Sequence, residues 1–124
     1  MNTTIDEGLG RLVVGLHVEN DEPDVFLIVL PQRCRLKQFT LQPNATVSGA
    51  DEVVTVSKAG STIGVGGVAS GSAAFSRTVI PAKTLVSYND ANNNFAEGEV
   101  CRFALNGASG ADDWWLLAEF ELQS

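Results

Sequence analysis

The amino-acid sequence predicts an all-β protein, an antiparallel two-sheet β-sandwich of eight or nine strands in a jelly-roll-like arrangement. Short runs rich in valine, isoleucine, threonine and aromatic residues recur at hairpin spacing, separated by glycine, asparagine, aspartate, serine or proline. Several runs alternate apolar and polar residues, which is the period of a strand with one buried face. No segment has a convincing helical period. A closed barrel is the second architecture that fits this pattern.

The clearest hairpin lies in the middle of the chain. Residues 52–58 read Glu-Val-Val-Thr-Val-Ser-Lys, a break with Ala59 and Gly60 follows, and a new run starts at Thr62. β-branched residues are crowded in a helix but fit a pleated sheet, so these two runs predict paired strands. The glycine-rich residues 63–68 then predict a bulge or the close approach of another backbone.

The other strands follow in order on both sides of this hairpin. Residues 11–19 alternate, and residues 25–30 are continuously apolar, which is typical of a central strand covered on both faces. In residues 33–42 the apolar positions change parity after Leu36, and this predicts a β-bulge near residues 37–38. Further strands are expected at residues 73–80, 84–88, 98–105 and 113–122.

The chain is long enough for one domain with a substantial core. Residues 1–10 are polar, with isolated Ile5 and Leu9, and are expected to form an extended N-terminal arm; residues 11–124 form the single β-sandwich domain. The N-terminus has no signal-peptide pattern. A domain of this size needs no covalent bridge, so Cys34 and Cys101 are expected to be free thiols.

The charge pattern argues against two classes of partner. The net charge is −7, without an acidic tail or a basic arm, so nucleic-acid binding is not expected. The longest uncharged stretch, residues 59–76, consists mostly of glycine, serine, alanine and threonine and is too polar to enter a membrane.

The sequence offers no catalytic, metal or cofactor site, and we expect a protein that is not an enzyme. The single histidine, His17, falls on the polar face of its strand and is expected to be an exposed strand residue, and no serine lies in a nucleophile elbow. One histidine and two distant cysteines cannot form a spaced zinc set. The residues Gly64–Gly67 lack the helix and the lysine of a phosphate loop.

Two surface features remain. Arg33, Arg35 and Lys37, here called the cationic stripe, suit either an edge strand protected from aggregation by charge or a docking stripe for an acidic protein surface. In the closing strand Trp114 faces the core, so Trp115 and Leu117 point the other way. Either another segment covers these two side chains, or they form a contact surface, because tryptophan is enriched at interface hot spots.

Three stretches resemble a known family: G-A-D-E-V-V-T-V-S-K-A-G-S-T-I at Gly49–Ile63, A-E-G-E-V-C-R-F-A-L at Ala96–Leu105, and W-W-L-L-A-E-F-E-L at Trp114–Leu122. They resemble small β-sandwich virion proteins of tailed bacteriophages, and the chain is most similar to the head-decoration or capsid cement proteins. The resemblance implies a protein that binds the outside of a phage capsid, with the major capsid protein as its partner, and stabilises it. It also implies a homo-oligomer, with a trimer favoured, in virions assembled in the host bacterial cytoplasm.

On this hypothesis the N-terminal arm and the cationic stripe meet the capsid, while the apolar pair of the closing strand meets a sister subunit. The expected capsid-binding residues are Ile5, Leu9, Arg33, Arg35 and Lys37. The expected oligomer-interface residues are Trp115 and Leu117. The alternatives are a phage tail, baseplate or fibre-base module, and a carbohydrate-binding β-sandwich module. The latter needs exposed aromatic platforms, for which the chain offers few candidates beyond its phenylalanines.

Overall fold

The computed structural model describes residues 2–8, 10–18, 25–106 and 113–123, with only the backbone for residues 2–8 and 106. In chain order the strands are β1 (Asn2–Gly8), β2 (Arg11–Val18), β3 (Val25–Val29), β4 (Cys34–Pro43), β5 (Glu52–Lys58), β6 (Ser61–Val68), β7 (Thr78–Pro81), β8 (Asn94–Phe95), β9 (Val100–Asn106) and β10 (Trp114–Leu122). Two short 3-10 helices, η1 (Ala82–Thr84) and η2 (Asp90–Asn92), lie between β7 and β8.

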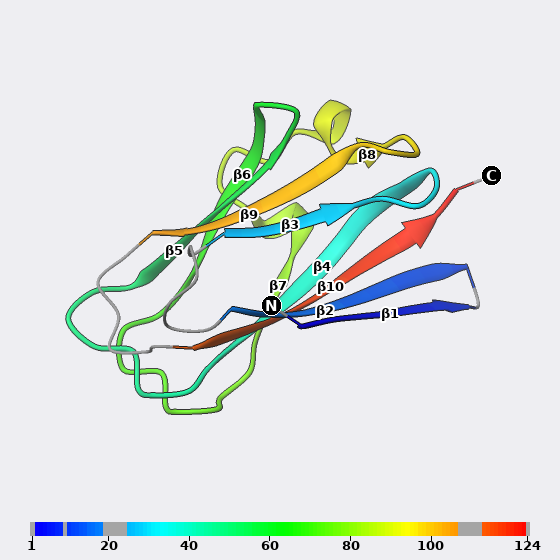
Figure 1. Cartoon of the computed structure of the whole chain (residues 1–124). Helices are drawn as coiled ribbons and strands as arrows, with labels where there is room; N and C mark the ends of the chain where they lie inside the picture. Colours follow the sequence, from blue (N-terminus) through cyan, green and yellow to red (C-terminus); the bar gives the residue numbers. More distant parts are fainter. Residues whose placement is uncertain (1, 9, 19–24, 107–112, 124) are drawn as a thin grey trace.

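Two antiparallel sheets form the molecule (Figure 1), which confirms the predicted two-sheet β-sandwich. The six-stranded sheet has the order β1-β2-β10-β4-β7, with β8 also paired to β4. The four-stranded sheet has the order β3-β9-β5-β6. Most neighbours in this order are distant in sequence, so each sheet joins strands from the N-terminal half of the chain to strands from its C-terminal half.

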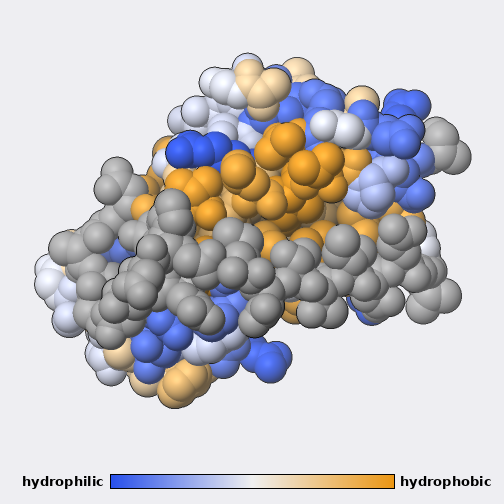
Figure 2. Space-filling model, in the orientation of Figure 1, coloured by the Kyte–Doolittle hydropathy of each residue, from blue (hydrophilic) through white to orange (hydrophobic). Residues whose placement is uncertain are grey.

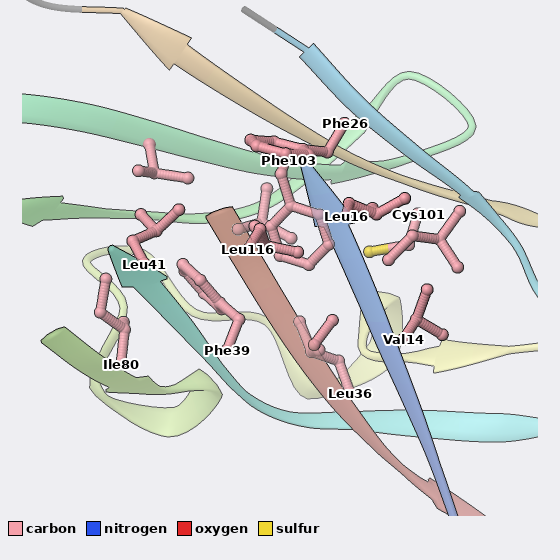
Figure 3. Close-up of a cluster of buried hydrophobic side chains, with 14 of the residues drawn as sticks. Val14, Leu16, Phe26, Leu36, Phe39, Leu41, Ile80, Cys101, Phe103 and Leu116 are labelled. Atoms are coloured by element: carbon pink, nitrogen blue, oxygen red, sulfur yellow. The ribbon is translucent and has the colours of Figure 1, made fainter. Parts of the chain in front are cut away.

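The core lies between the two sheets, where alternate residues of β2, β4 and β10 meet those of β3, β5 and β9 (Figure 3). Phe39 of β4 and Phe103 of β9 are fully buried, and their rings meet edge to face with centroids 5.0 Å apart. Phe95 and Phe120 form a second such pair at 6.0 Å. Trp114 is buried as predicted, with 3% of its surface exposed.

The bulge predicted near residues 37–38 is confirmed. Along the pairing of β4 with β10, Gln38 lies opposite Glu119 and Leu36 lies opposite Phe120, so Lys37 is the extra residue. The bulge keeps both Leu36 and Phe39 in the core although their sequence separation is odd.

The glycine-rich strand β6 allows a close approach, as its sequence predicts. A Cβ atom on Gly64 would lie 2.6 Å from Cβ of Leu85, and one on Gly66 would lie 2.9 Å from Cδ2 of Leu85. The space that these glycines leave therefore holds the Leu85 side chain. The adjoining Val86 pairs with Val65 through two backbone hydrogen bonds of 2.9 and 3.0 Å.

Three sequence predictions about strands are wrong. The run at residues 25–30 is not a central strand, because β3 is the outer strand of its sheet and its outward side chains are exposed. The strand expected at 73–80 begins only at Thr78, since the preceding residues form turns. The strand expected at 84–88 is reduced to the single bridge at Val86, because η1 takes up its first residue.

The N-terminal segment lies in the six-stranded sheet. β1 pairs with β2 from Asn2, opposite His17, to Gly8, opposite Arg11. The residues predicted as an extended arm therefore include an edge strand of the molecule's own sheet, visible beside β2 in Figure 1.

Candidate interaction surfaces

The cationic stripe lies at the start of β4, and its three members differ in their surroundings. Arg33 lies in the bend before β4 and is exposed, and Lys37 is the exposed bulge residue. Arg35 is half-buried, and its Nη2 lies 3.5 Å from Oε2 of Glu121 on β10. One member of the stripe is thus engaged within the sheet, which leaves the charges of Arg33 and Lys37 at the surface.

Of the two N-terminal residues expected to bind the capsid, Ile5 and Leu9, the structure describes only the backbone of Ile5. The backbone of Ile5 lies opposite Val14 of β2. Leu9 lies outside the described residues.

The predicted apolar pair, Trp115 and Leu117, lines a groove on the outer face of the six-stranded sheet. The groove has a volume of about 440 Å³. One row of residues across it consists of Gly15 on β2, Leu117 on β10, Thr40 on β4 and Val79 on β7. The neighbouring row consists of His17, Trp115 and Gln42, and Arg77 completes the lining at its end. The groove is hollow because Gly15 has no side chain and Thr40 has a short one beside the larger Leu117 and Trp115.

Trp115 is held in place by two other rings. The His17 ring stacks on it in parallel, with centroids 4.6 Å apart, and the Phe75 ring lies 5.9 Å away. His17 is not the exposed residue expected from its strand position, because this stacking leaves only 17% of its side chain exposed and its Nε2 lies 3.4 Å from Oδ2 of Asp113. Sequence alternation indicates which face a side chain takes, but not which side chains stack across strands.

Phe75 stands in a strained position beside the groove. Its φ angle is 61°, a left-handed conformation that is rare for a bulky residue, yet 58% of its surface is exposed. Two hydrogen bonds fix it: its N–H donates to the Pro43 carbonyl oxygen at 2.7 Å, and Gln42 Nε2 donates to its carbonyl oxygen at 2.8 Å. The fold therefore keeps an aromatic ring at the surface at a conformational cost of about 1–3 kcal/mol.

The groove favours an anionic or apolar neighbour. None of the residues that line it carries a carboxylate, although the chain has 15 acidic and 8 basic residues. Arg77 is exposed at its end and makes no ion pair within the part of the chain that the structure describes. Leu117 and Val79 are 49% and 53% exposed.

A second apolar surface covers the outer face of the four-stranded sheet, and we refer to it as the aliphatic face. Its residues point outward from β3, β9, β5, β6 and the bridge at residue 86: Val25, Leu27, Val29, Val53, Thr55, Val65, Val86, Val100 and Ala104. Figure 2 shows its part over β3 and β9 as a hydrophobic area. Arg102 is the one charged side chain at the outward positions that the structure describes on these strands.

This surface is not among those expected from the sequence, although the continuous apolar run at residues 25–30 is a signal for it. Leu27 and Val29 alternate with the buried Phe26 and Ile28, so half of the continuous apolar run faces outward. An antiparallel sheet with one face in water normally carries polar residues there. The continuous run could therefore indicate an exposed apolar face as well as a doubly covered strand.

The two cysteines lie away from both surfaces, in the core. Cys34 and Cys101 are buried free thiols, as predicted, and burial raises the pKa of Cys34 to about 11 and that of Cys101 well above its ordinary value. Both thiols therefore stay protonated and pack as small apolar groups. Within the described residues, no three histidine, cysteine, aspartate or glutamate side chains are grouped to hold a metal ion. No helix in that part of the chain has the length and apolar character to cross a membrane.

Comparison with known proteins adds no family to this picture. No protein-family model matches the chain, and no curated protein matches it at a significant level.

Proposed function

We propose that this protein is a virion structural protein of a tailed bacteriophage that binds the outside of the capsid and stabilises the shell. One observation carries the proposal: the exposed large apolar side chains of the described residues gather on the outer faces of both sheets, with Val79 at the edge between them. A protein with two such surfaces is suited to link two neighbours, because large exposed apolar patches mark interaction sites. The resemblance of three sequence stretches to capsid cement proteins supports the same function.

The groove is the proposed contact with a sister subunit in a small homo-oligomer. Trp115 and Leu117 supply apolar area, and the stacking of His17 fixes the indole ring before any partner arrives. Such preorganisation reduces the entropy lost on association. The strained, exposed Phe75 fits this role, since strained residues cluster at functional sites.

The cationic stripe is the proposed electrostatic contact with acidic loops of the major capsid protein. Arg33 and Lys37 are exposed and make no ion pair with the described residues, so their charges act outward. Exposed charges of this kind mainly set the association rate and its dependence on salt. Arg35 contributes less, because Glu121 lies beside it.

The N-terminal strand β1 is proposed to pair with a strand of a capsid subunit. β1 is the outer strand of its sheet, and such an edge can accept a further strand from a neighbouring protein by backbone hydrogen bonds.

A carbohydrate-binding function is less well supported by the geometry. A sugar platform requires an open aromatic face, and His17 stacks on one face of Trp115 while Phe75 lies beside the ring. Trp114 is buried.

The proposal is tested by adding the purified protein to phage shells assembled without it. We expect the protein to co-sediment with the shells and to raise the temperature at which they rupture. Trp115→Ala should shift the free protein toward monomer in sedimentation velocity, with Ser61→Ala, an exposed residue at the start of β6 that does not line the groove, as the control. Binding to purified tails instead of shells would point to a tail or baseplate module. Failure to bind shells, or binding without any gain in their thermal resistance, would refute a cement function.

A further inference from the structure

The aliphatic face has the composition of a buried surface but lies outside the core. Leu27 and Val29 are 54% and 64% exposed, and Val86 is 70% exposed. The residues follow one another across neighbouring strands, for example from Val25 over Ala104 and Thr55 to Val65, which are opposite each other in register. A continuous surface of this kind is typical of an interface rather than of scattered surface residues.

Arg102 determines which kind of partner this face can accept. Its side chain lies between Leu27 on β3 and Ser57 on β5, and it makes no ion pair with any residue that the structure describes. Covering the face with another protein would remove the guanidinium from water. A buried charge without a partner is strongly destabilising, so a stable contact has to supply a carboxylate opposite Arg102.

A second copy of this chain does not meet that requirement. In a two-fold contact the same patch faces itself, and its outward strand positions that the structure describes hold no carboxylate. Asp51 lies at the edge of the face, where its Oδ1 already accepts a hydrogen bond from the Ser70 N–H. Contact with the outer face of the six-stranded sheet in another copy would meet Glu119 and Glu121, which already lie beside Arg11 and Arg35. The charge of Arg102 therefore favours a different protein as the occupant.

The size of the face predicts how strongly one copy binds. The ten outward residues of this face, Arg102 included, each occupy about 4.8 Å across the strands and ~6.8 Å along them, and together cover roughly 330 Å². A contact over this area buries on the order of 650 Å² from both partners, which is below the range of specific, stable interfaces. A single copy would bind weakly, and an oligomer with several such faces would bind more tightly by multivalency.

From these observations we infer that the aliphatic face is the surface that contacts the capsid. It packs against an aliphatic patch of a shell subunit, and that patch presents a carboxylate to Arg102. The inference rests on the proposed cement function and assigns it a surface. The cationic stripe then steers the approach, and the aliphatic face supplies the area that holds the complex.

The test measures binding of variants to shells assembled without the protein. Leu27→Lys combined with Val29→Lys should lower the shell affinity at least tenfold while the oligomeric state in sedimentation stays unchanged. Ser61→Lys, at the exposed first position of β6, adds the same kind of charge outside the face and should bind as the wild type does. Leu27→Thr combined with Val29→Thr keeps the strand propensity without a charge and should also bind more weakly, which covers the case that the lysine variant does not fold.

Arg102→Met tests the proposed carboxylate. This variant keeps an apolar stem and removes the charge, so we expect weaker shell binding and a smaller loss of binding between low and high salt. If the wild type binds shells and the Leu27 and Val29 variants bind equally well, the assignment of the aliphatic face is wrong. The proposed cement function is not contradicted by that result. A change in oligomeric state in those variants would instead identify the face as a contact between copies, and an unaltered salt dependence in Arg102→Met would exclude the carboxylate. No wild-type binding at all would reject both the face and the function.

Discussion

The pair formed by Phe39 and Phe103 should be a main link between the two sheets, and a double-mutant cycle can measure it. Both side chains are fully buried, and their rings meet at 5.0 Å and 61°. A buried phenylalanine removes roughly 150 Å² from water, which at about 25 cal/mol per Å² corresponds to about 4 kcal/mol. We therefore expect Phe39→Ala to lower the free energy of unfolding by about 3–5 kcal/mol, since a cavity also remains.

The ring pair itself should contribute a smaller, separable amount. Phe39→Leu and Phe103→Leu keep the core apolar, and the difference between the double variant and the sum of the single ones should give a coupling of about 0.5–1.5 kcal/mol. Urea unfolding followed by circular dichroism and tryptophan fluorescence measures each value, with Val86→Ala, at 70% exposure, as a control expected to change stability by less than about 0.5 kcal/mol. A loss below about 1 kcal/mol for Phe39→Ala, or no coupling, would show that these rings do not join the sheets as described.

Four further outcomes follow from the packing, the thiols and the strained position of Phe75. Trp114→Ala should cost about 3–5 kcal/mol in denaturant titration because the side chain is buried, and a loss below about 1 kcal/mol would contradict its inward orientation. Alkylation of the denatured protein without reductant should modify both Cys34 and Cys101 in mass spectrometry; no modification would mean a disulfide. Burial raises the pKa of the Cys34 thiol in the folded protein from 9.0 to about 11. The stabilisation that comes from this protonated thiol is therefore complete below about pH 9 and disappears as the pH rises toward 11. Over this pH range the free energy of unfolding should fall more steeply for the wild type than for Cys34→Ala, and equal slopes would refute this. Phe75→Gly should raise the free energy of unfolding by about 1 kcal/mol by relieving the positive φ, and a decrease would show that its ring contacts outweigh the strain.

Local patterns in the sequence predict much of this fold because they act within one strand. The parity change after Leu36 places the bulge at Lys37, and the opposite orientations of Trp114 and Trp115 follow from the period of two. Each of these features depends only on which residues a single strand must bury. The order of the strands in the two sheets has no such local signal, because it depends on pairings between distant segments such as β2 with β10.

The candidate surfaces could be predicted only in part, for physical reasons. Alternation identified Trp115 and Leu117 as outward residues, but the groove around them also needs Gly15 from β2 and Val79 from β7. The sequence does not predict the aliphatic face, because a continuous apolar run is also typical of a strand buried on both sides. Whether a face is covered depends on what packs over it, and the sequence of one strand such as β3 does not carry that information.

On the proposed assignment, Arg102 affects both self-association over the aliphatic face and the choice of a partner for that face. An exposed aliphatic face invites contacts between copies, but the opposed, unpaired arginines of a two-fold contact weaken such contacts. The net charge of −7 adds long-range repulsion between copies that does not depend on orientation. A partner that places a carboxylate opposite Arg102 pairs with this charge and can cover the whole apolar face. The same arginine thus disfavours self-association over this face and favours an acidic, aliphatic surface.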